Sequence, residues 1–159
     1  MNNILKRVNN SRGCRLSLTV ISHASVVINV LAYAVLLVFS IVKEKDALPL
    51  IILGALIPFV LVTLARKIIN APRPYELYGF YEKRPKEKGG ESFPSRHVFS
   101  SFVIATLALP FSYALALACF LSGIALSVCR VFLGIHFVRD VVAGALVGVL
   151  SGALSILIF

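Results

Sequence analysis

The longest stretch of the chain without a charged residue covers residues 98–129 and reads VFSSFVIATLALPFSYALALACFLSGIALSVC. One helix over these 32 residues would be about 48 Å long, whereas a bilayer core of about 30 Å is crossed by roughly 20 helical residues. The sequence Leu109-Pro110-Phe111-Ser112 lies inside the stretch, and a proline interrupts the hydrogen bonds of a helix interior. The stretch therefore predicts two shorter helices, over about 98–109 and 112–129, joined by a tight turn.

Three further stretches without charge, 16–42, 47–65 and 141–159, are 27, 19 and 19 residues long, and each suits one membrane crossing. Hydrophobic residues make up 58% of the chain and charged residues 14%, against about 45–50% and about 25% in typical soluble domains. We therefore expect an all-α integral membrane helical bundle of about five transmembrane helices, in one domain over residues 16–159. Residues 1–15 are expected to form a basic N-terminal arm, interfacial or disordered, rather than a cleaved signal peptide.

Some residues of the apolar stretches are expected to serve packing alone. Gly144, Gly148 and Gly152 are spaced four apart, so they lie near one helix face and allow another helix backbone to approach closely. The three cysteines show neither metal-ligand spacing nor a paired framework, and no role is assigned to them. His23 lies inside the first apolar stretch and is expected to make an ordinary interhelical or interfacial contact.

Sixteen Lys and Arg against seven Asp and Glu give a net charge of +9, which is typical of proteins that bind nucleic acid or anionic membranes. The apolar stretches favour the membrane, so we expect no nucleic-acid partner. Residues 66–96 hold eight of the basic and four of the acidic residues. Pro72, Pro74, Pro85 and the pair Gly89-Gly90 argue against a long helix there, and a solvated loop is expected over 75–91.

The two edges of this polar segment have the character of a phosphate site. Arg66 and Lys67 lie where an apolar helix ends, and Arg73 stands between two prolines that restrict its backbone. At the other edge, Pro94 and Ser95 suit a helix start, whose free N–H groups favour an anion. A basic segment can also bind lipid headgroups nonspecifically, but a restrained arginine near a helix N-terminus favours a defined phosphate site.

A third polar group separates the last two apolar stretches, between Arg130 and Asp140. His136 and Asp140 are four residues apart, so the carboxylate can hold one imidazole nitrogen and leave the other free to attack an electrophile. The alternative is an interfacial histidine beside a snorkelling arginine. Two crossings over residues 98–129 bring this group to the face of the 66–96 segment. Seven residues are then expected to converge: Arg66, Arg73, Ser95, His97, Arg130, His136 and Asp140.

In these residues the chain resembles the type 2 phosphatidic acid phosphatase (PAP2) family, which is related to the vanadium haloperoxidases. The family's three motifs are Lys-x6-Arg-Pro, Pro-Ser-Gly-His and Ser-Arg-x5-His-x3-Asp. The resemblance covers about residues 60–150. The matching positions are Arg66-x6-Arg73-Pro74, Pro94-Ser95-Arg96-His97 and Cys129-Arg130-x5-His136-x3-Asp140.

The chain departs from the family motifs at three positions. Arg66 replaces the usual Lys and keeps the positive charge, although the neighbouring Lys67 is an alternative for this role. Arg96 replaces Gly, which keeps the backbone N–H but adds a bulky cation. Cys129 replaces Ser, which removes a good hydrogen-bond donor.

The resemblance implies a mechanism for the matching residues. His136 would attack phosphorus and form a phosphohistidine, Asp140 would orient its ring, and His97 would protonate the leaving group and then activate water. No metal or other cofactor is expected, because Asp140 is the only carboxylate within the motifs. The residues expected to bind the substrate phosphate are Arg66, Arg73, Ser95, Arg96 and Arg130.

The expected substrate is a lipid phosphate whose tail stays in the bilayer: undecaprenyl diphosphate, phosphatidylglycerol phosphate or phosphatidic acid. Two alternatives are a non-catalytic phospholipid-binding membrane protein with a degenerate PAP2 site, and haloperoxidase chemistry with vanadate, which the apolar stretches oppose. Fourteen basic residues lie on the motif face, against only Lys43 and Lys45 on the other. By the positive-inside rule, a multi-pass protein of the cell membrane is expected to carry its site on the cytoplasmic face. The sequence does not indicate an oligomeric state.

Overall fold

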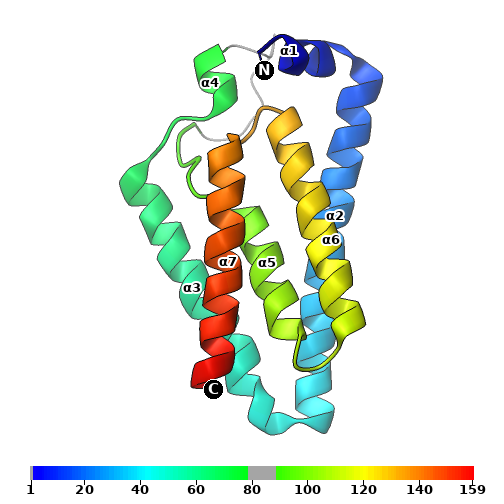
Figure 1. The fold of residues 1–159 in the computed structure, drawn as a ribbon, viewed down its shortest axis with the longest axis vertical. Helices are drawn as coiled ribbons and strands as arrows, with labels where there is room; N and C mark the ends of the chain where they lie inside the picture. The colour runs from blue at the N-terminus through cyan, green and yellow to red at the C-terminus, as the bar shows by residue number, and fades with distance from the viewer. Residues whose placement is uncertain (1, 79–88) are drawn as a thin grey trace.

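Helices account for the regular structure of the chain, as a computed structural model of residues 2–78 and 89–159 shows (Figure 1). These described residues contain seven α-helices, one 3-10 turn and no strand. The elements are α1 (Asn2–Asn10), α2 (Arg12–Lys43), η1 (Lys45–Ala47), α3 (Leu48–Ile69), α4 (Pro74–Tyr78), α5 (Arg96–Ala108), α6 (Tyr113–Phe132) and α7 (Val138–Ile158).

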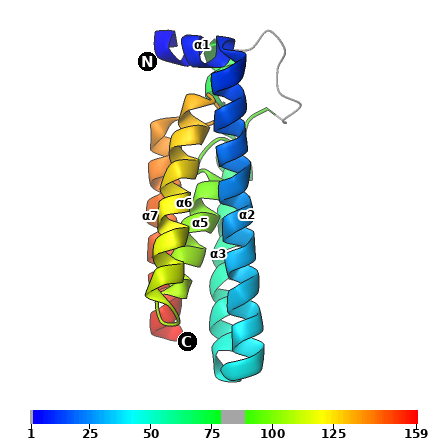
Figure 2. The same cartoon turned by 90° about the vertical axis from the view of Figure 1, so that its right-hand side faces the viewer.

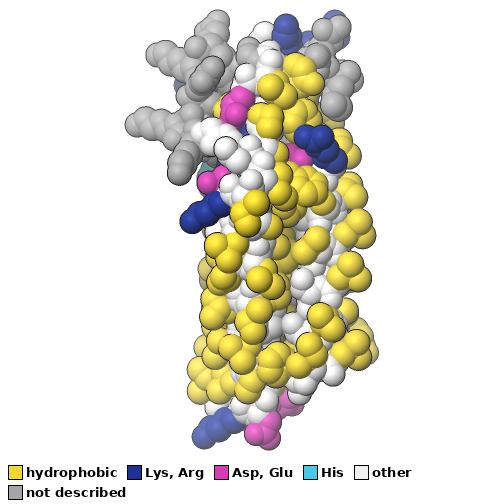
Figure 3. Space-filling model, turned by 90° about the vertical axis from the view of Figure 1, so that its left-hand side faces the viewer, with side chains coloured by type: hydrophobic (Ala, Val, Ile, Leu, Met, Phe, Trp, Pro, Cys, Tyr) yellow, Lys and Arg dark blue, Asp and Glu magenta, His cyan; other side chains and the backbone are white. Residues whose placement is uncertain are grey.

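The surface of the bundle is suited to lipid. Within the described residues, four helical segments are long and apolar enough to cross a membrane: Arg12–Lys43, Lys45–Tyr78, Tyr113–Phe132 and Val138–Ile158. Figure 3 shows hydrophobic side chains over the middle of one face, with charged side chains toward its two ends. The expected all-α membrane bundle is confirmed, although the fifth helix, α5, is shorter than the other four.

The break expected near Pro110 is present, and it produces this short helix. α5 ends at Ala108, α6 begins at Tyr113, and the Oγ of Ser112 accepts a hydrogen bond from the N–H of Leu115 at 3.3 Å. With 13 residues, α5 is about 20 Å long, less than a bilayer core. It packs against α2, α3, α6 and α7 and lies in the middle of the bundle, so its neighbours shield it from lipid (Figures 1 and 2).

The core forms around α5. Phe99, Val103 and Leu107 are each at most 2% exposed, and they belong to one cluster with Leu36 of α2 and Ile51 of α3. Sequestering such side chains from water contributes about 25 cal/mol per Å² in a soluble protein. In a bilayer, close packing replaces that term as the main attraction between helices.

The glycine spacing of α7 has the packing role that was expected. A Cβ atom added at Gly144 would lie 2.6 Å from the carbonyl oxygen of Ser95, and one at Gly148 would lie 2.7 Å from that of Phe99. A Cβ atom at Gly152 would lie 2.7 Å from the side chain of Thr106. Because no side chain separates the two backbones, α7 and α5 approach closely along their whole contact.

The first residues of the chain form a helix that lies across one end of the bundle (Figures 1 and 2). The amide of Asn9 in α1 donates to the carbonyl of Leu5 at 2.8 Å and to that of Phe132, at the end of α6, at 3.1 Å. The next helix, α2, begins at Arg12, inside the segment expected to be an arm. The ends of α3 and α6 and the starts of α5 and α7 therefore lie toward the same end as the N-terminus, where the polar residues gather.

Candidate active site

The two edges of the polar segment 66–96 are bound to one another. The N–H of Ser92 donates to the carbonyl of Ala71 at 2.9 Å, and the N–H of Gly90 donates to the Glu76 carboxylate at 2.7 Å. The Nε of Arg73 donates to the carbonyl of Gly90 at 3.0 Å. Gly90 has a φ of 75°, a conformation that glycine adopts without steric cost. These bonds fix the returning chain beside the end of α3.

The solvated loop expected over 75–91 coincides only in part with the described residues. Its beginning belongs to the short helix α4 and its last residues return beside α3, whereas 79–88 lie outside the described residues.

Arg66, rather than Lys67, points into the site. The Arg66 side chain is 5% exposed, and its Nη1 donates to the carbonyls of Ser92, at 3.5 Å, and Pro94. Its Nε has no hydrogen-bond partner among the described residues, whereas Lys67 is exposed. Arg66 therefore holds the segment before α5 and keeps one N–H available for a further acceptor.

The start of α5 carries two of the expected residues. Ser95 is the N-cap residue and is fully buried, and its N–H donates to the carbonyl of Asp140 at 2.9 Å. In the described part of the chain, the Ser95 hydroxyl has no hydrogen-bond partner. His97 is exposed and lies within electrostatic range of Arg130 and His136. Ser95 is thus anchored by its backbone while its hydroxyl stays available.

His136 lies in the short connection between α6 and α7. Gly134, with a φ of 66°, turns the chain, and the N–H of His136 donates to the carbonyl of Arg130 at 3.2 Å. The His136 side chain is 3% exposed, and its Nδ1 lies 3.7 Å from the Oδ2 of Asp140, whose side chain is fully buried. Among the described residues no contact engages Nε2 of the ring, so this nitrogen is available for chemistry.

Ser92 completes this pair, and the sequence did not point to it. Its Oγ donates to the Oδ2 of Asp140 at 2.5 Å and lies 3.3 Å from the Nδ1 of His136. The N–H of Phe137 donates to the same carboxylate oxygen at 3.0 Å. A serine beside Gly89-Gly90 and Glu91 is an ordinary turn residue, and only the spatial contact distinguishes it.

The surroundings of His136 favour the neutral form of its ring. Burial is the main cause that lowers the pKa of His136 below its ordinary value, since desolvation disfavours the charged imidazolium. The Asp140 carboxylate opposes this effect, while the positive charges of Arg73 and Arg66 add to it. A neutral imidazole keeps the lone pair that a nucleophile requires.

The remaining basic residues surround the pair at different depths. Arg73 and Arg130 are partly buried, and the guanidinium of Arg73 lies 5.9 Å from the ring centre of Tyr75. Arg139 is 68% exposed, and its Nε lies 3.5 Å from Asp140 Oδ1. Hydrogen bonds thus link the Arg66 side chain to the segment before Ser95, and the backbone of Ser95 to that of Asp140, whose side chain lies beside His136.

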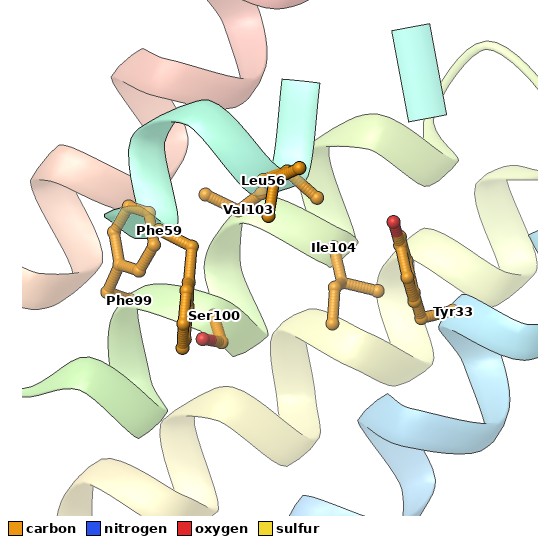
Figure 4. A pocket seen from close by; sticks show the side chains of 8 residues that line it. Tyr33, Leu56, Phe59, Phe99, Ser100, Val103 and Ile104 are labelled. Atoms are coloured by element: carbon orange, nitrogen blue, oxygen red, sulfur yellow. The ribbon is translucent and has the colours of Figure 1, made fainter. Parts of the chain in front are cut away.

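Two adjoining cavities extend from this site into the apolar part of the bundle, between α2, α3 and α5. One, of about 300 Å³, is lined by residues that include His97 and Arg96. The other, of about 230 Å³, shares Phe59, Ser100 and Ile104 with the first. Figure 4 shows Leu56 and Phe59 on α3 across from Ser100, Val103 and Ile104 on α5, with Tyr33 on α2. A mostly apolar space therefore adjoins the site through Arg96 and His97.

Comparison with known proteins identifies a family and a fold for the chain. The family model described as the PAP2 superfamily matches residues 46–159. The crystal structure of Aquifex aeolicus LpxE is similar, with 25% identity, a TM-score of 0.72, and coverage of 97% of this chain and 93% of that one. The structure of a transmembrane PAP2-type phosphatidylglycerolphosphate phosphatase from Bacillus subtilis shares the fold at 22% identity and a TM-score of 0.64, covering 97% and 81%. No curated protein sequence matched the chain.

Proposed function

This chain belongs to the PAP2 superfamily, and we propose that it hydrolyses the phosphomonoester or diphosphate of a membrane lipid through a phosphohistidine intermediate. The observation that carries the proposal is the buried His136–Asp140 pair, 3.7 Å apart at Nδ1 and Oδ2, among side chains of positive charge. Phosphoryl transfer requires a nucleophile and fixed cations around the phosphate oxygens, and this arrangement supplies both.

In the first step, Nε2 of His136 attacks phosphorus while the bond from phosphorus to the leaving oxygen breaks. His97 gives its proton to that oxygen, so the leaving group departs as a neutral hydroxyl or a protonated phosphate. The positive charge that develops on the His136 ring is stabilised by Asp140, with the Ser92 hydroxyl between them.

In the second step, His97 accepts a proton from water, and the resulting hydroxide attacks the phosphorus of the phosphohistidine. The phosphorus–nitrogen bond breaks, inorganic phosphate leaves, and the His136 ring returns to its neutral form. General acid–base assistance of this kind contributes about 10²–10⁴-fold to the rate.

The transferred phosphate is held by the arginines. Guanidinium groups bind phosphate oxygens through charged hydrogen bonds, and the Nε of Arg66, which has no partner among the described residues, is one such donor. The Ser95 hydroxyl, likewise without a partner in the described part of the chain, and the N–H groups at the start of α5 add neutral donors. The residues proposed to bind the transferred phosphate are Arg66, Arg73, Ser95 and Arg130, with Arg96 contributing its backbone N–H.

The lipid nature of the substrate is supported by the cavities between α2, α3 and α5. A space lined by side chains such as Leu56, Val103 and Ile104 suits a hydrocarbon tail beside a polar headgroup site. Undecaprenyl diphosphate, phosphatidylglycerol phosphate and phosphatidic acid all have this form. The proposal includes no metal, and in the described residues no three His, Cys, Asp or Glu side chains gather where they would hold one.

The test is phosphate release from a panel of lipid phosphates by the purified protein in detergent with EDTA. We expect wild-type turnover, loss of turnover to the detection limit in His136→Ala, and a decrease of about 10²–10⁴-fold in His97→Ala. His23→Ala is the matched control, because His23 is exposed and its ring contacts only the carbonyl of Thr19 among the described residues.

Undiminished turnover in His136→Ala would refute the mechanism. Binding of lipid phosphates by wild type without release of phosphate would instead favour the alternative function, a phospholipid-binding membrane protein that does not catalyse. Loss of wild-type turnover on adding EDTA would refute metal independence.

A further inference from the structure

We propose that the 300 Å³ cavity beside His97 receives the leaving group, and that the Arg96 side chain binds a second phosphate there. The preferred substrate would then be a lipid whose leaving group carries its own phosphate, such as a lipid diphosphate. This inference rests on the function proposed above and names the substrate class for it.

The position of Arg96 is fixed by its neighbours. Arg96 is the first residue of α5, and its guanidinium carbon lies 5.6 Å from the ring centre of Phe59 on α3. A cation over an aromatic face is held by the ring quadrupole. Arg96, Phe59 and His97 all line the same cavity, so the cation held over Phe59 belongs to the wall of that space.

Within the described residues, the charge of Arg96 has no carboxylate partner in an ion pair. The cavity below it is lined by apolar side chains such as Val26, Val30 and Ile104. A guanidinium beside an apolar space is stabilised most by an anion that accepts two parallel hydrogen bonds. The oxygens of a phosphate have this geometry. The Arg96 guanidinium is therefore available to bind a phosphate, because no carboxylate of the described residues pairs with it.

The position of His97 indicates where the leaving group lies. His97 protonates the leaving oxygen in the proposed mechanism, so the leaving group lies next to His97, on the side of the phosphorus opposite the nucleophile. His97 and Arg96 line this cavity, whereas His136 does not. The transferred phosphate lies by His136 and Arg66, and Arg96 is placed to bind what remains attached to the lipid.

A second polar group lines the same cavity. Asn29 of α2 is 3% exposed, and its amide nitrogen donates to Ser122 Oγ at 2.6 Å and to the Ser25 carbonyl at 2.8 Å. Its Oδ1 has no hydrogen-bond partner among the described residues. A buried amide acceptor without a donor suits a hydroxyl group, including that of a protonated phosphate. The lining of the cavity thus combines a cation and an acceptor with apolar side chains.

The family motif has Gly at the position of Arg96, and glycine offers only its backbone N–H. The side chain is therefore an addition that the basic reaction does not require. For a diphosphate, the bond between the terminal phosphorus and the bridging oxygen breaks, and His97 protonates that oxygen. The leaving group is then a lipid monophosphate whose remaining charge faces Arg96.

The test compares substrates with the same tail and one or two phosphates: farnesyl monophosphate against farnesyl diphosphate. In a second pair, phosphatidic acid is compared with phosphatidylglycerol phosphate, whose leaving group contains a phosphodiester. This pair shows whether a phosphodiester in the leaving group suffices for the preference or a diphosphate is required. We expect Arg96→Gln to lower kcat/KM for the favoured two-phosphate substrate about 10–100-fold more than for its one-phosphate partner, the range for a charged hydrogen bond.

Arg96→Lys should recover part of this preference, because it restores the charge without the planar fork. Arg15→Gln is the matched control, since it removes an exposed cation from the start of α2, at the end of the bundle that carries the site. It should leave the substrate ratio unchanged. Equal losses on both members of each pair, or no loss on any, would overturn the inference while leaving the phosphatase function intact. Failure of wild type to hydrolyse any of the four substrates would overturn the proposed function itself.

Discussion

Ser92 connects the two side chains on which the proposed chemistry depends. Its hydroxyl hydrogen is directed to Asp140, 2.5 Å away, which leaves its oxygen free to accept from the Nδ1–H of His136, 3.3 Å away. At 3.7 Å, the direct distance from the ring nitrogen to the carboxylate exceeds a normal hydrogen bond. The serine therefore acts as a positioning residue that transmits the orienting effect of the carboxylate to the ring.

This role predicts the effect of Ser92→Ala. We expect kcat to fall about 10-fold, which corresponds to the loss of roughly one charged hydrogen bond. KM should change less than about twofold, because the Ser92 hydroxyl is fully buried against Asp140 and His136. In an Asp140→Asn background the same substitution should cost much less, since the hydrogen bond has lost its charged acceptor. Steady-state kinetics of the four proteins in this cycle measure the coupling. Full additivity of the two substitutions would contradict the positioning role.

The sequence predicts some of the contacts in the site and not others. His136 and Asp140 are four apart and flanked by apolar stretches, so their proximity is a local property of the chain. Arg66 was expected to bind phosphate, but its Nη1 donates to the carbonyls of Ser92 and Pro94. Bonds to backbone carbonyls depend on how distant segments meet, and no spacing in the sequence encodes them.

At the scale of helices, the contact between α5 and α7 sets the relative position of the two halves of the site. α5 begins with Ser95 as its cap and carries His97, and α7 begins beside His136 and carries Asp140. The N–H of Ser95 bonds to the carbonyl of Asp140, directly above the first glycine of the α7 series. A change in the spacing of the two helices would therefore move the proposed acid away from the nucleophile.

Gly144→Ala tests this dependence. The added methyl would lie 2.6 Å from a backbone oxygen that cannot rotate away, so we expect a destabilisation of about 1–3 kcal/mol and a loss of activity. Gly13→Ala is the control, because a Cβ there has nothing within 4 Å and alanine favours a helix over glycine. Thermal unfolding in detergent and phosphate release measure the two effects. Equal stability of the two variants would contradict the close approach of α5 and α7.

The helices themselves followed from the sequence to within a few residues. The break at Pro110 was predicted because proline cannot continue the helical bonds, and the structure has α5 and α6 on either side of it. The central place of α5 was not predicted, because the residue pattern of a short apolar helix does not distinguish a surrounding of lipid from one of other helices. The helical form of residues 2–10 was left open for a similar reason, since a basic amphipathic segment becomes ordered only against a surface.

At the scale of the molecule, the distribution of charge gives the chain an orientation. Of the described basic residues, ten belong to the segments assigned to the motif face, whereas Lys43 and Lys45 belong to the opposite face. Short basic segments beside membrane helices are retained on the cytoplasmic side. The proposed site would therefore face the cytoplasm.

Labelling of single cysteines in intact cells with a membrane-impermeant maleimide checks this orientation. Lys86, a natural choice in the polar segment, lies outside the described residues, so we select Lys67→Cys on the motif face and Glu44→Cys on the other. Both substitutions are made in a Cys14→Ser background, because Cys14 is exposed and would itself react with the maleimide. Cys119 and Cys129 are buried and are kept. We expect Glu44→Cys to react in intact cells and Lys67→Cys only after permeabilisation. The reverse pattern would place the site outside the cell.

The cavity between α2, α3 and α5 has a consequence for how such a protein changes over time. Half of its wall comes from Tyr33 on α2 and from Ala55, Leu56 and Phe59 on α3, whereas His97 belongs to α5, His136 to the connection before α7, and Asp140 to α7. Mutations in that half of the wall can therefore accumulate without displacing the reacting groups. A lineage built on this plan can acquire new lipid preferences through its N-terminal helices while inheriting one unaltered chemistry from its C-terminal half.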